Sequence, residues 1–173
     1  MDSFKILVCC HKQTEHIGDA NFPSILLGSK FAGEELKKAY EHDFWDCTGE
    51  NIGRLHPYCA ELTSIYWAWK NYEKLGDPEY IGLFHYRRFF NFCSPLAEED
   101  LWKCAFFDFD EKTRRRFGWN EETIKDFCKD YDLILPHSEQ ILDPHDWATP
   151  TTLETHYKHA HCPEDFDLVM DFI

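Results

Sequence analysis

The sequence has 173 residues, of which 43% are hydrophobic and 17% aromatic, so it is long enough for one domain with a proper core. Its formal net charge of −14 argues against a general nucleic-acid binder, because counterion release needs clustered Lys and Arg. No apolar run approaches the roughly 20 residues of a membrane-spanning helix, and the amino terminus lacks the features of a signal peptide. We therefore expect a cytoplasmic protein whose eight cysteines, with no C-x-x-C pair among them, are reduced.

The first segment with a clear pattern, residues 4–10, is F-K-I-L-V-C-C and predicts a buried strand. His11 and Lys12 follow it directly, so basic groups are expected at the carboxyl end of this strand. Such a start is typical of nucleotide-binding α/β domains, although the chain contains neither G-x-G-x-x-G nor a P-loop. A short strand within residues 22–28 and a turn or two of helix over 34–40 come next.

A polar loop over residues 46–54 leads into the clearest predicted helix, residues 57–75. Pro57 suits its first turn, and Glu61 favours the positive end of the helix dipole. Helical spacing predicts a core-facing side made of Leu62, Ile65, Tyr66, Trp69 and Tyr72. Asn51 and Glu61 lie where a loop enters a helix, a place that often meets a ligand.

The next strand ends in a basic stretch that is the main candidate for a binding site. Gly76-Asp77-Pro78 is a turn signal, and residues 80–84 after it predict a buried strand. This strand stops at His85-Tyr86-Arg87-Arg88, and ligands of open α/β sheets collect at such carboxyl ends. Guanidinium groups there could hold an anion in a bidentate way, or they could pair with some of the many carboxylates.

The region after this strand predicts helices over 96–107 and 120–129 and a strand over 131–136. Asp108-Phe109-Asp110 is a D-x-D, the pattern with which many sugar-nucleotide enzymes hold a divalent cation. It does not follow an apolar strand, and arginines at 114–116 lie close to it in the sequence. A solvated charge run is therefore the preferred interpretation.

The last part of the chain predicts a turn over 143–147, a helix over 151–161 and a final helix after Pro163. His156, His159 and His161 raise the alternative of a zinc hydrolase, but their spacing is not H-E-x-x-H and no cysteine is suitably placed. The final helix reaches the last residue without a cap, which we interpret as a sign of a C-terminally truncated chain.

Several long motifs, spread over nearly the whole chain, resemble one family. They are I-L-V-C-C-H-K, G-E-N-I-G-R-L-H-P-Y-C-A-E-L-T-S-I-Y-W-A-W-K-N, Y-I-G-L-F-H-Y-R-R-F-F, Y-D-L-I-L-P and L-E-T-H-Y-K-H-A-H-C-P-E-D-F-D. The chain resembles the uncharacterised-domain glycosyltransferases of bacterial capsule, exopolysaccharide and lipopolysaccharide gene clusters, some of which are galactofuranosyltransferases.

The resemblance implies a GT-A-like (Rossmann-like) α/β fold, a mixed sheet flanked by helices, as a single domain over residues 1–173. It implies a nucleotide-sugar donor, with UDP-galactofuranose as one candidate, and a saccharide or lipid-linked saccharide acceptor. A lipid-linked acceptor is compatible with peripheral contact of the protein with a membrane. In GT-A enzymes the strand at the position of residues 80–84 commonly ends in a metal-binding D-x-D. We therefore expect cationic side chains to replace the metal here, while metal dependence stays open.

The residues expected to act in such a transferase fall into three groups. Donor binding is assigned to His11, Lys12, Asn51, His85, Tyr86, Arg87 and Arg88. The group that deprotonates the acceptor of an inverting reaction is Glu61, Asp143 or Glu154, with no choice among them. His156 and His161 are expected in the acceptor pocket, and no metal ligand is assigned. A non-catalytic module that binds a nucleotide sugar or a glycan is the alternative function.

Overall fold

The computed structural model describes residues 3–14, 19–93, 110–135 and 140–171. They belong to two compact units, Met1–Ile134 and Leu135–Ile173, and each unit is described by itself. The prediction of a single domain over residues 1–173 stays a prediction.

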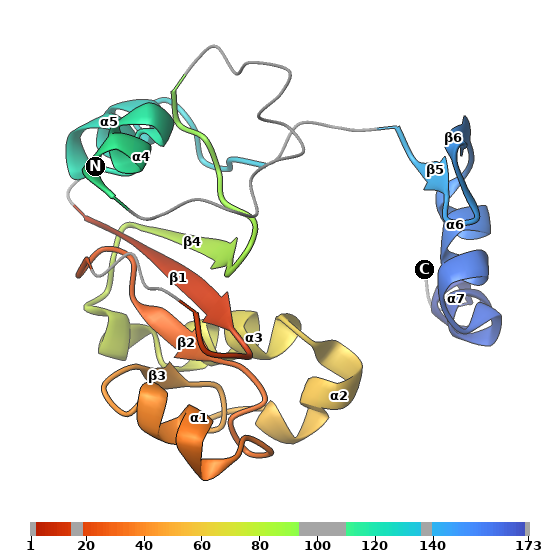
Figure 1. Cartoon of the computed structure of the whole chain (residues 1–173), viewed down its shortest axis with the longest axis horizontal. Helices are drawn as coiled ribbons and strands as arrows, with labels where there is room; N and C mark the ends of the chain where they lie inside the picture. Colours follow the sequence, from red (N-terminus) through yellow and green to blue (C-terminus); the bar gives the residue numbers. More distant parts are fainter. Residues whose placement is uncertain (1–2, 15–18, 94–109, 136–139, 172–173) are drawn as a thin grey trace. The chain divides into compact units, whose positions relative to one another are not determined.

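A four-stranded sheet organises the first unit (Figure 1). Its strands are β1 (Phe4–Cys10), β2 (Ser24–Leu26), β3 (Phe44–Trp45) and β4 (Tyr80–His85), in the order β3-β2-β1-β4. All neighbouring pairs are parallel. Helices flank the sheet, so the predicted α/β architecture is confirmed, as are the strands expected at 4–10, within 22–28 and at 80–84.

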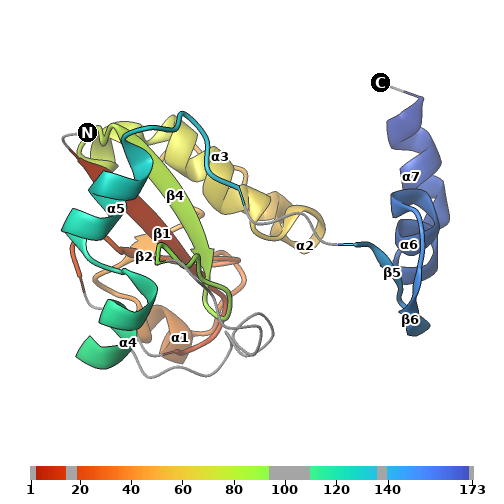
Figure 2. The ribbon, with the colours of Figure 1, turned by 90° about the horizontal axis from the view of Figure 1, so that it is seen from above.

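Side-chain alternation along β1 divides the core of this unit into two clusters, one on each face of the sheet. Phe4, Ile6, Val8 and Cys10 belong to the larger cluster, which also contains residues of α5 (Glu121–Cys128) and of the end of α4 (Glu111–Phe117). Tyr40, which caps α1 (Glu34–Ala39), joins the same cluster. Leu7 and Cys9 pack instead with α3 (Leu62–Lys70) on the opposite face (Figure 2).

The helix predicted over residues 57–75 is wrong as a single element. The structure has α2 (His56–Cys59), α3 and a 3-10 turn at Tyr72–Leu75, and Ala60 separates the first two with φ 44° and ψ −123°. Most of the predicted core-facing side is also wrong, because Leu62, Ile65 and Trp69 are exposed and only Tyr72 packs on a core cluster, while Tyr66 is partly buried. The buried residues of α3 are Thr63, Ser64, Trp67 and Ala68.

The inward side of α3 carries polar residues because it meets two buried polar groups. Ser64 meets the buried thiol of Cys9, and Thr63 meets the buried carboxylate of Asp46. Both partners come from segments far away in the sequence, so periodicity of apolar residues within the helix could not reveal them.

Two further predictions for this unit need correction. Only Phe84 of β4 is buried, because β4 is an outer strand of the described sheet and has one unpaired edge. Residues 131–135 form no strand, although Tyr80 Oη donates to the carbonyl of Tyr131 (2.6 Å) and Ile134 packs on the larger core cluster.

The helix expected over 96–107 lies outside the described residues, as do Asp108 and Phe109 of the D-x-D. Asp110, the last residue of that motif, caps α4 by accepting a hydrogen bond from the backbone N–H of Thr113 (2.7 Å). The neighbouring arginines have partners of their own, since Arg114 pairs with Asp19 and Arg115 with Glu111.

The second unit consists of a hairpin followed by two helices. Its strands are β5 (Leu142–Asp143) and β6 (Asp146–Pro150), which pair in antiparallel fashion around the predicted turn. Its helices are α6 (Leu153–Ala160), capped by the Thr152 hydroxyl, and α7 (Pro163–Met170). The two helices confirm the sequence prediction, whereas the strands were not predicted.

No helix in the described part of the chain is long and apolar enough to cross a membrane. Seven cysteines are described, and all of them are free thiols. Cys9, Cys10 and Cys128 are buried, whereas Cys93 is only partly buried.

Candidate functional site at the carboxyl edge of β1 and β4

The carboxyl ends of β1 and β4 place two basic segments side by side. Cys9 lies opposite His85 in the parallel register, so His11 and Lys12 leave the sheet next to the end of β4. The chain then turns tightly, because the N–H of His85 donates to the carbonyl of Arg88 (3.0 Å) and the N–H of Arg88 to that of His85 (2.9 Å). Tyr86 and Arg87 form the tip of this turn.

The ring of Tyr86 is the centre of a positively charged group. His11 meets it edge-on with ring centroids 4.8 Å apart, and Lys12 Nζ lies 4.9 Å from its centroid. The guanidinium carbon of Arg87 lies 5.1 Å from the same centroid. Such cation–π contacts hold charged groups in place while leaving their N–H donors open.

The arginines of this edge differ from Arg114 and Arg115 of α4 in their ion pairs. Within residues 3–14, 19–93, 110–135 and 140–171, neither Arg87 nor Arg88 forms an ion pair with a carboxylate, and both are exposed. Arg114 and Arg115 are both paired with acids. Pairing of Arg87 with a remote acid, the alternative considered from the sequence, does not occur among these residues.

A carboxylate faces the same edge from the start of α3. Glu61 Oε1 lies 3.4 Å from His85 Nε2, and the Glu61 side chain is 49% exposed. On the other side of the ring, His85 Nδ1 accepts a hydrogen bond from the backbone N–H of Arg87 (3.2 Å). Burial lowers the pKa of His85, an effect that Glu61 opposes and that the charges of Arg88, Arg87 and His11 reinforce.

The pKa of His11, at the end of β1, is lowered as well. Burial lowers the pKa of His11, and the nearby charge of Lys12 lowers it further, while Glu61 opposes the shift. Both histidines of this edge therefore favour the neutral imidazole at neutral pH, and the positive charge is carried by Lys12, Arg87 and Arg88.

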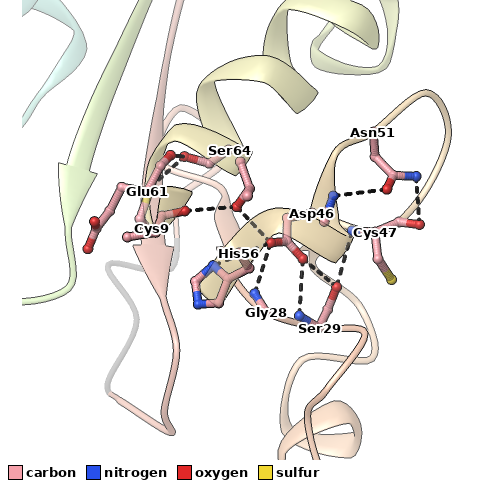
Figure 3. Close-up of polar contacts among 12 residues, drawn as sticks. Cys9, Gly28, Ser29, Asp46, Cys47, Asn51, His56, Glu61 and Ser64 are labelled. Carbon is pink, nitrogen blue, oxygen red and sulfur yellow. Dashed lines mark hydrogen bonds and ion pairs between the residues drawn. The ribbon is translucent and has the colours of Figure 1, made fainter. Parts of the chain in front are cut away.

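A buried thiol lies directly beneath the edge, but its chemistry is suppressed. Cys9 Sγ lies 3.1 Å from Ser64 Oγ, and the Ser64 hydroxyl donates to the carbonyl of Glu61 (2.7 Å; Figure 3). Burial raises the pKa of Cys9 to about 12. Cys9 thus supports the first turn of α3 as a neutral thiol and is not a nucleophile.

A fully buried carboxylate, Asp46, ties this helix to the loop after β2 (Figure 3). It accepts hydrogen bonds from two backbone N–H groups, Gly28 (2.8 Å) and Ser29 (3.0 Å). It also accepts from the hydroxyls of Ser29 (2.6 Å) and Thr63 (2.8 Å). Asp46 begins the polar loop expected over residues 46–54 and directly follows β3, a strand that the sequence pattern did not predict.

His56 completes this buried group. Its Nδ1 lies 3.8 Å from Asp46 Oδ2 and, within the described residues, is a buried nitrogen without a hydrogen-bond partner. The ring packs against Gly28, where a Cβ would come within 2.7 Å of His56 Cδ2.

Asn51, a predicted donor-binding residue, has all of its side-chain polar groups engaged in its own loop. Its Nδ2 donates to the carbonyls of Cys47 (2.9 Å) and Gly49 (2.8 Å), and its Oδ1 accepts from the N–H of Gly53 (3.1 Å). Asn51 therefore shapes the loop that leads into α2, and a direct role in donor binding stays a prediction.

The other predicted residues belong to the second unit. Asp143 accepts from the N–H of His145 (2.8 Å) and pairs with His159 (3.3 Å), and its pKa is lowered mainly by the first of these bonds. Glu154 pairs with Lys158. His156 Nδ1 donates to the carbonyl of Leu142 (2.5 Å), and the ring of His161 lies 4.9 Å from that of Tyr157.

Metal ligands do not gather in the described part of the chain, where no group of three or more His, Cys, Asp or Glu side chains could hold an ion. His156 and His159, the core of the zinc alternative, have separate partners in Leu142 and Asp143.

Comparison with known proteins assigns the chain to a family. The model of the family described as "Domain of unknown function (DUF4422)" matches residues 5–173. The chain belongs to the DUF4422 family. No curated protein matches it.

The fold of this DUF4422 chain is similar to that of a solved protein structure. The chain is similar to the apo structure of WbbM, a bifunctional glycosyltransferase, with a TM-score of 0.79 and 28% sequence identity. The match covers 98% of this chain but only 28% of the WbbM chain. The DUF4422 chain therefore has a glycosyltransferase-like fold, which agrees with the predicted GT-A-like architecture.

Proposed function

We propose that this protein is a glycosyltransferase that moves a sugar from a nucleotide donor to a saccharide or lipid-linked saccharide acceptor in surface polysaccharide synthesis. The observation that carries the proposal is the group of cations around Tyr86 at the carboxyl edge of the sheet, in a fold shared with a glycosyltransferase. Among the described residues, no carboxylate forms an ion pair with these cations. Ligands of open α/β sheets bind at this edge. A UDP-sugar, with UDP-galactofuranose as one candidate, is the proposed donor.

In this proposal the donor diphosphate binds to Arg87, Arg88 and Lys12. Guanidinium groups match phosphate oxygens in a bidentate way, and an ammonium group adds a point charge. As the bond to the sugar breaks, negative charge grows on the departing nucleoside diphosphate, and these side chains stabilise it. They would take over the electrostatic role that a divalent metal has in other transferases.

Among the three carboxylates considered for the acceptor proton, we propose Glu61. It lies at the strand edge that carries the cations, and His85 is the side-chain partner that the structure gives it there. Asp143 is a weaker base because its pKa is lowered, and Glu154 is paired with Lys158. His156 and His161 stay proposals for the acceptor pocket.

Titration calorimetry with UDP tests the donor site. Replacing Arg87 with Ala should weaken UDP binding about 10- to 100-fold, because a charge-assisted hydrogen bond contributes about 1.5–3 kcal/mol. Arg115→Ala is the matched control, since Arg115 is exposed and paired with Glu111, and it should leave the dissociation constant unchanged. Equal binding by wild type and Arg87→Ala would contradict this placement of the donor.

The same titration in EDTA and in manganese tests the role assigned to the cations. Binding of similar strength in both solutions is expected, and strict dependence on manganese would overturn the metal-free version of the site.

A turnover assay that detects released UDP tests the activity itself. Glu61→Gln should retain UDP binding and lose about 10²–10⁴-fold in kcat, the usual contribution of a general base. Asp143→Asn and Glu154→Gln serve as matched variants, and the carboxylate whose loss removes turnover is the base. UDP binding by the wild type without turnover on any acceptor would support the alternative of a binding module.

A further inference from the structure

We propose that His85 is a neutral positioning residue, which directs its Nε2–H to the carboxylate of Glu61 and does not bind the donor as a cation. The inference rests on the proposed function for the role of Glu61, whereas the site of the proton on His85 rests on the hydrogen bond from the Arg87 N–H and on the 3.4 Å distance between His85 Nε2 and Glu61 Oε1. It revises the expectation that His85 belongs to the charged donor-binding group.

The backbone fixes the tautomer of His85. The N–H of Arg87 donates to His85 Nδ1 (3.2 Å), and a ring nitrogen that accepts a hydrogen bond carries no proton. The proton of a neutral imidazole must then be on Nε2, which lies 3.4 Å from Glu61 Oε1. Since the tight turn from His85 to Arg88 fixes the Arg87 N–H, this arrangement is built into the backbone.

Strand alternation brings the two partners to the same face of the sheet. His85 pairs in register with Cys9, so both side chains point to the face that α3 covers. Glu61 lies at the start of α3, and two contacts hold this end of the helix: Thr63 with Asp46 and Ser64 with Cys9. Figure 3 shows Glu61, Cys9 and Ser64 gathered at this point.

The groups that face His85 favour its neutral form. Its side chain is only 14% exposed, and this burial is the main cause that lowers its pKa. Glu61 opposes the shift, whereas Arg88, Arg87 and the ring of His11 lower the pKa further. A cationic His85 would also have to break the hydrogen bond at Nδ1. Lys12 adds further positive charge through its contact with Tyr86, whose ring lies 4.3 Å from that of His85.

The assigned role follows from the transfer step. Glu61 takes the proton of the acceptor hydroxyl, the acceptor oxygen forms a bond to the anomeric carbon, and the bond from that carbon to the diphosphate breaks. The electron pair leaves with the nucleoside diphosphate. His85 exchanges no proton; by holding Oε1 it fixes the orientation of the carboxylate, so that Oε2 faces the acceptor.

The state of His85 can be measured without any activity. In a ¹⁵N-labelled protein at pH 7.5, two-bond ¹⁵N–¹H correlation spectra distinguish the two neutral tautomers from imidazolium. We expect the resonances that disappear in His85→Gln to show the neutral form protonated at Nε2. Imidazolium, or the form protonated at Nδ1, would overturn the inference whatever the protein's function is.

Kinetics of His85 variants then test the positioning role. His85→Gln places an amide N–H close to the position of Nε2 and should keep kcat within about 10-fold, whereas His85→Ala should lose about 100-fold. Both should bind UDP within about 3-fold of wild type, and His42→Gln, at a remote side chain that is 92% exposed, should change neither quantity. Weaker UDP binding in both variants, restored by His85→Lys, would identify His85 as a phosphate-binding cation.

The experiments distinguish failure of the proposed transferase function from failure of the role assigned to His85. A wild-type protein that neither binds UDP nor turns over removes the proposed function and with it the role of Glu61, while the spectra still decide the tautomer. A wild type that turns over, together with a His85→Ala variant of unchanged kcat, removes the positioning role alone.

Discussion

The buried carboxylate of Asp46 stabilises the segments that carry the candidate site, so its removal should lower the free energy of unfolding. Asp46 is fully buried and joins the loop after β2 to the first turn of α3, the turn that carries Glu61. The change to make is Asp46→Ala, which removes the acceptor of four hydrogen bonds without adding bulk.

The magnitude follows from the donors left behind. The hydroxyl of Thr63 keeps the carbonyl of Ala60 (3.0 Å) as an acceptor, but the N–H groups of Gly28 and Ser29 and the hydroxyl of Ser29 lose theirs. A buried donor without a partner costs about 1–3 kcal/mol, so the loss of three acceptors in Asp46→Ala should lower the free energy of unfolding by about 3–9 kcal/mol. For a domain stabilised by about 5–15 kcal/mol this is a large loss. Asp46→Asn should cost about 1–3 kcal/mol, because its amide nitrogen would replace the oxygen that accepts from Gly28.

Urea denaturation followed by tryptophan fluorescence measures these differences, since Trp67 is buried on α3. Glu121→Gln is the control, as it removes an exposed pair with Lys125 and should cost no more than about 0.5 kcal/mol. An Asp46→Ala variant within about 1 kcal/mol of wild type at an unchanged m-value would refute the supporting role of this carboxylate.

Two further predictions concern the residues around Asp46. Because burial raises the pKa of Cys9 from 9.0 to about 12, the folded state holds this proton where the unfolded state has lost it. Through this group stability should fall above pH 9 by up to about 1.4 kcal/mol per pH unit. Cys9→Ala should make the alkaline unfolding curve less steep by the contribution of Cys9. Gly28→Ala should destabilise by about 1–3 kcal/mol in thermal unfolding, since Gly28 has φ +60° and a Cβ would press on His56. Gly33→Ala, with open space at its Cβ, should stay within about 0.5 kcal/mol, and equal effects at both glycines would contradict the argument.

Local sequence patterns were sufficient to predict the strands and the basic residues at the carboxyl ends of β1 and β4. The apolar run of residues 4–10 and the run before His85 each predict a strand, and parallel strands of one sheet bring their carboxyl ends together. The closeness of His11 and Lys12 to Tyr86 follows from that topology. The family motifs likewise pointed to the glycosyltransferase-like fold that the similarity to WbbM supports.

The sequence by itself determined the α/β fold and the cations at the ends of β1 and β4, because side-chain alternation and apolar runs act between near neighbours in the chain. Only the tertiary structure decided that α3 turns Thr63 and Ser64 inward and that His85 faces Glu61. Those contacts join segments as far apart as Cys9 and Ser64, which are 55 residues from each other. A buried polar group must find its partner wherever the fold provides one, and no local periodicity encodes that choice.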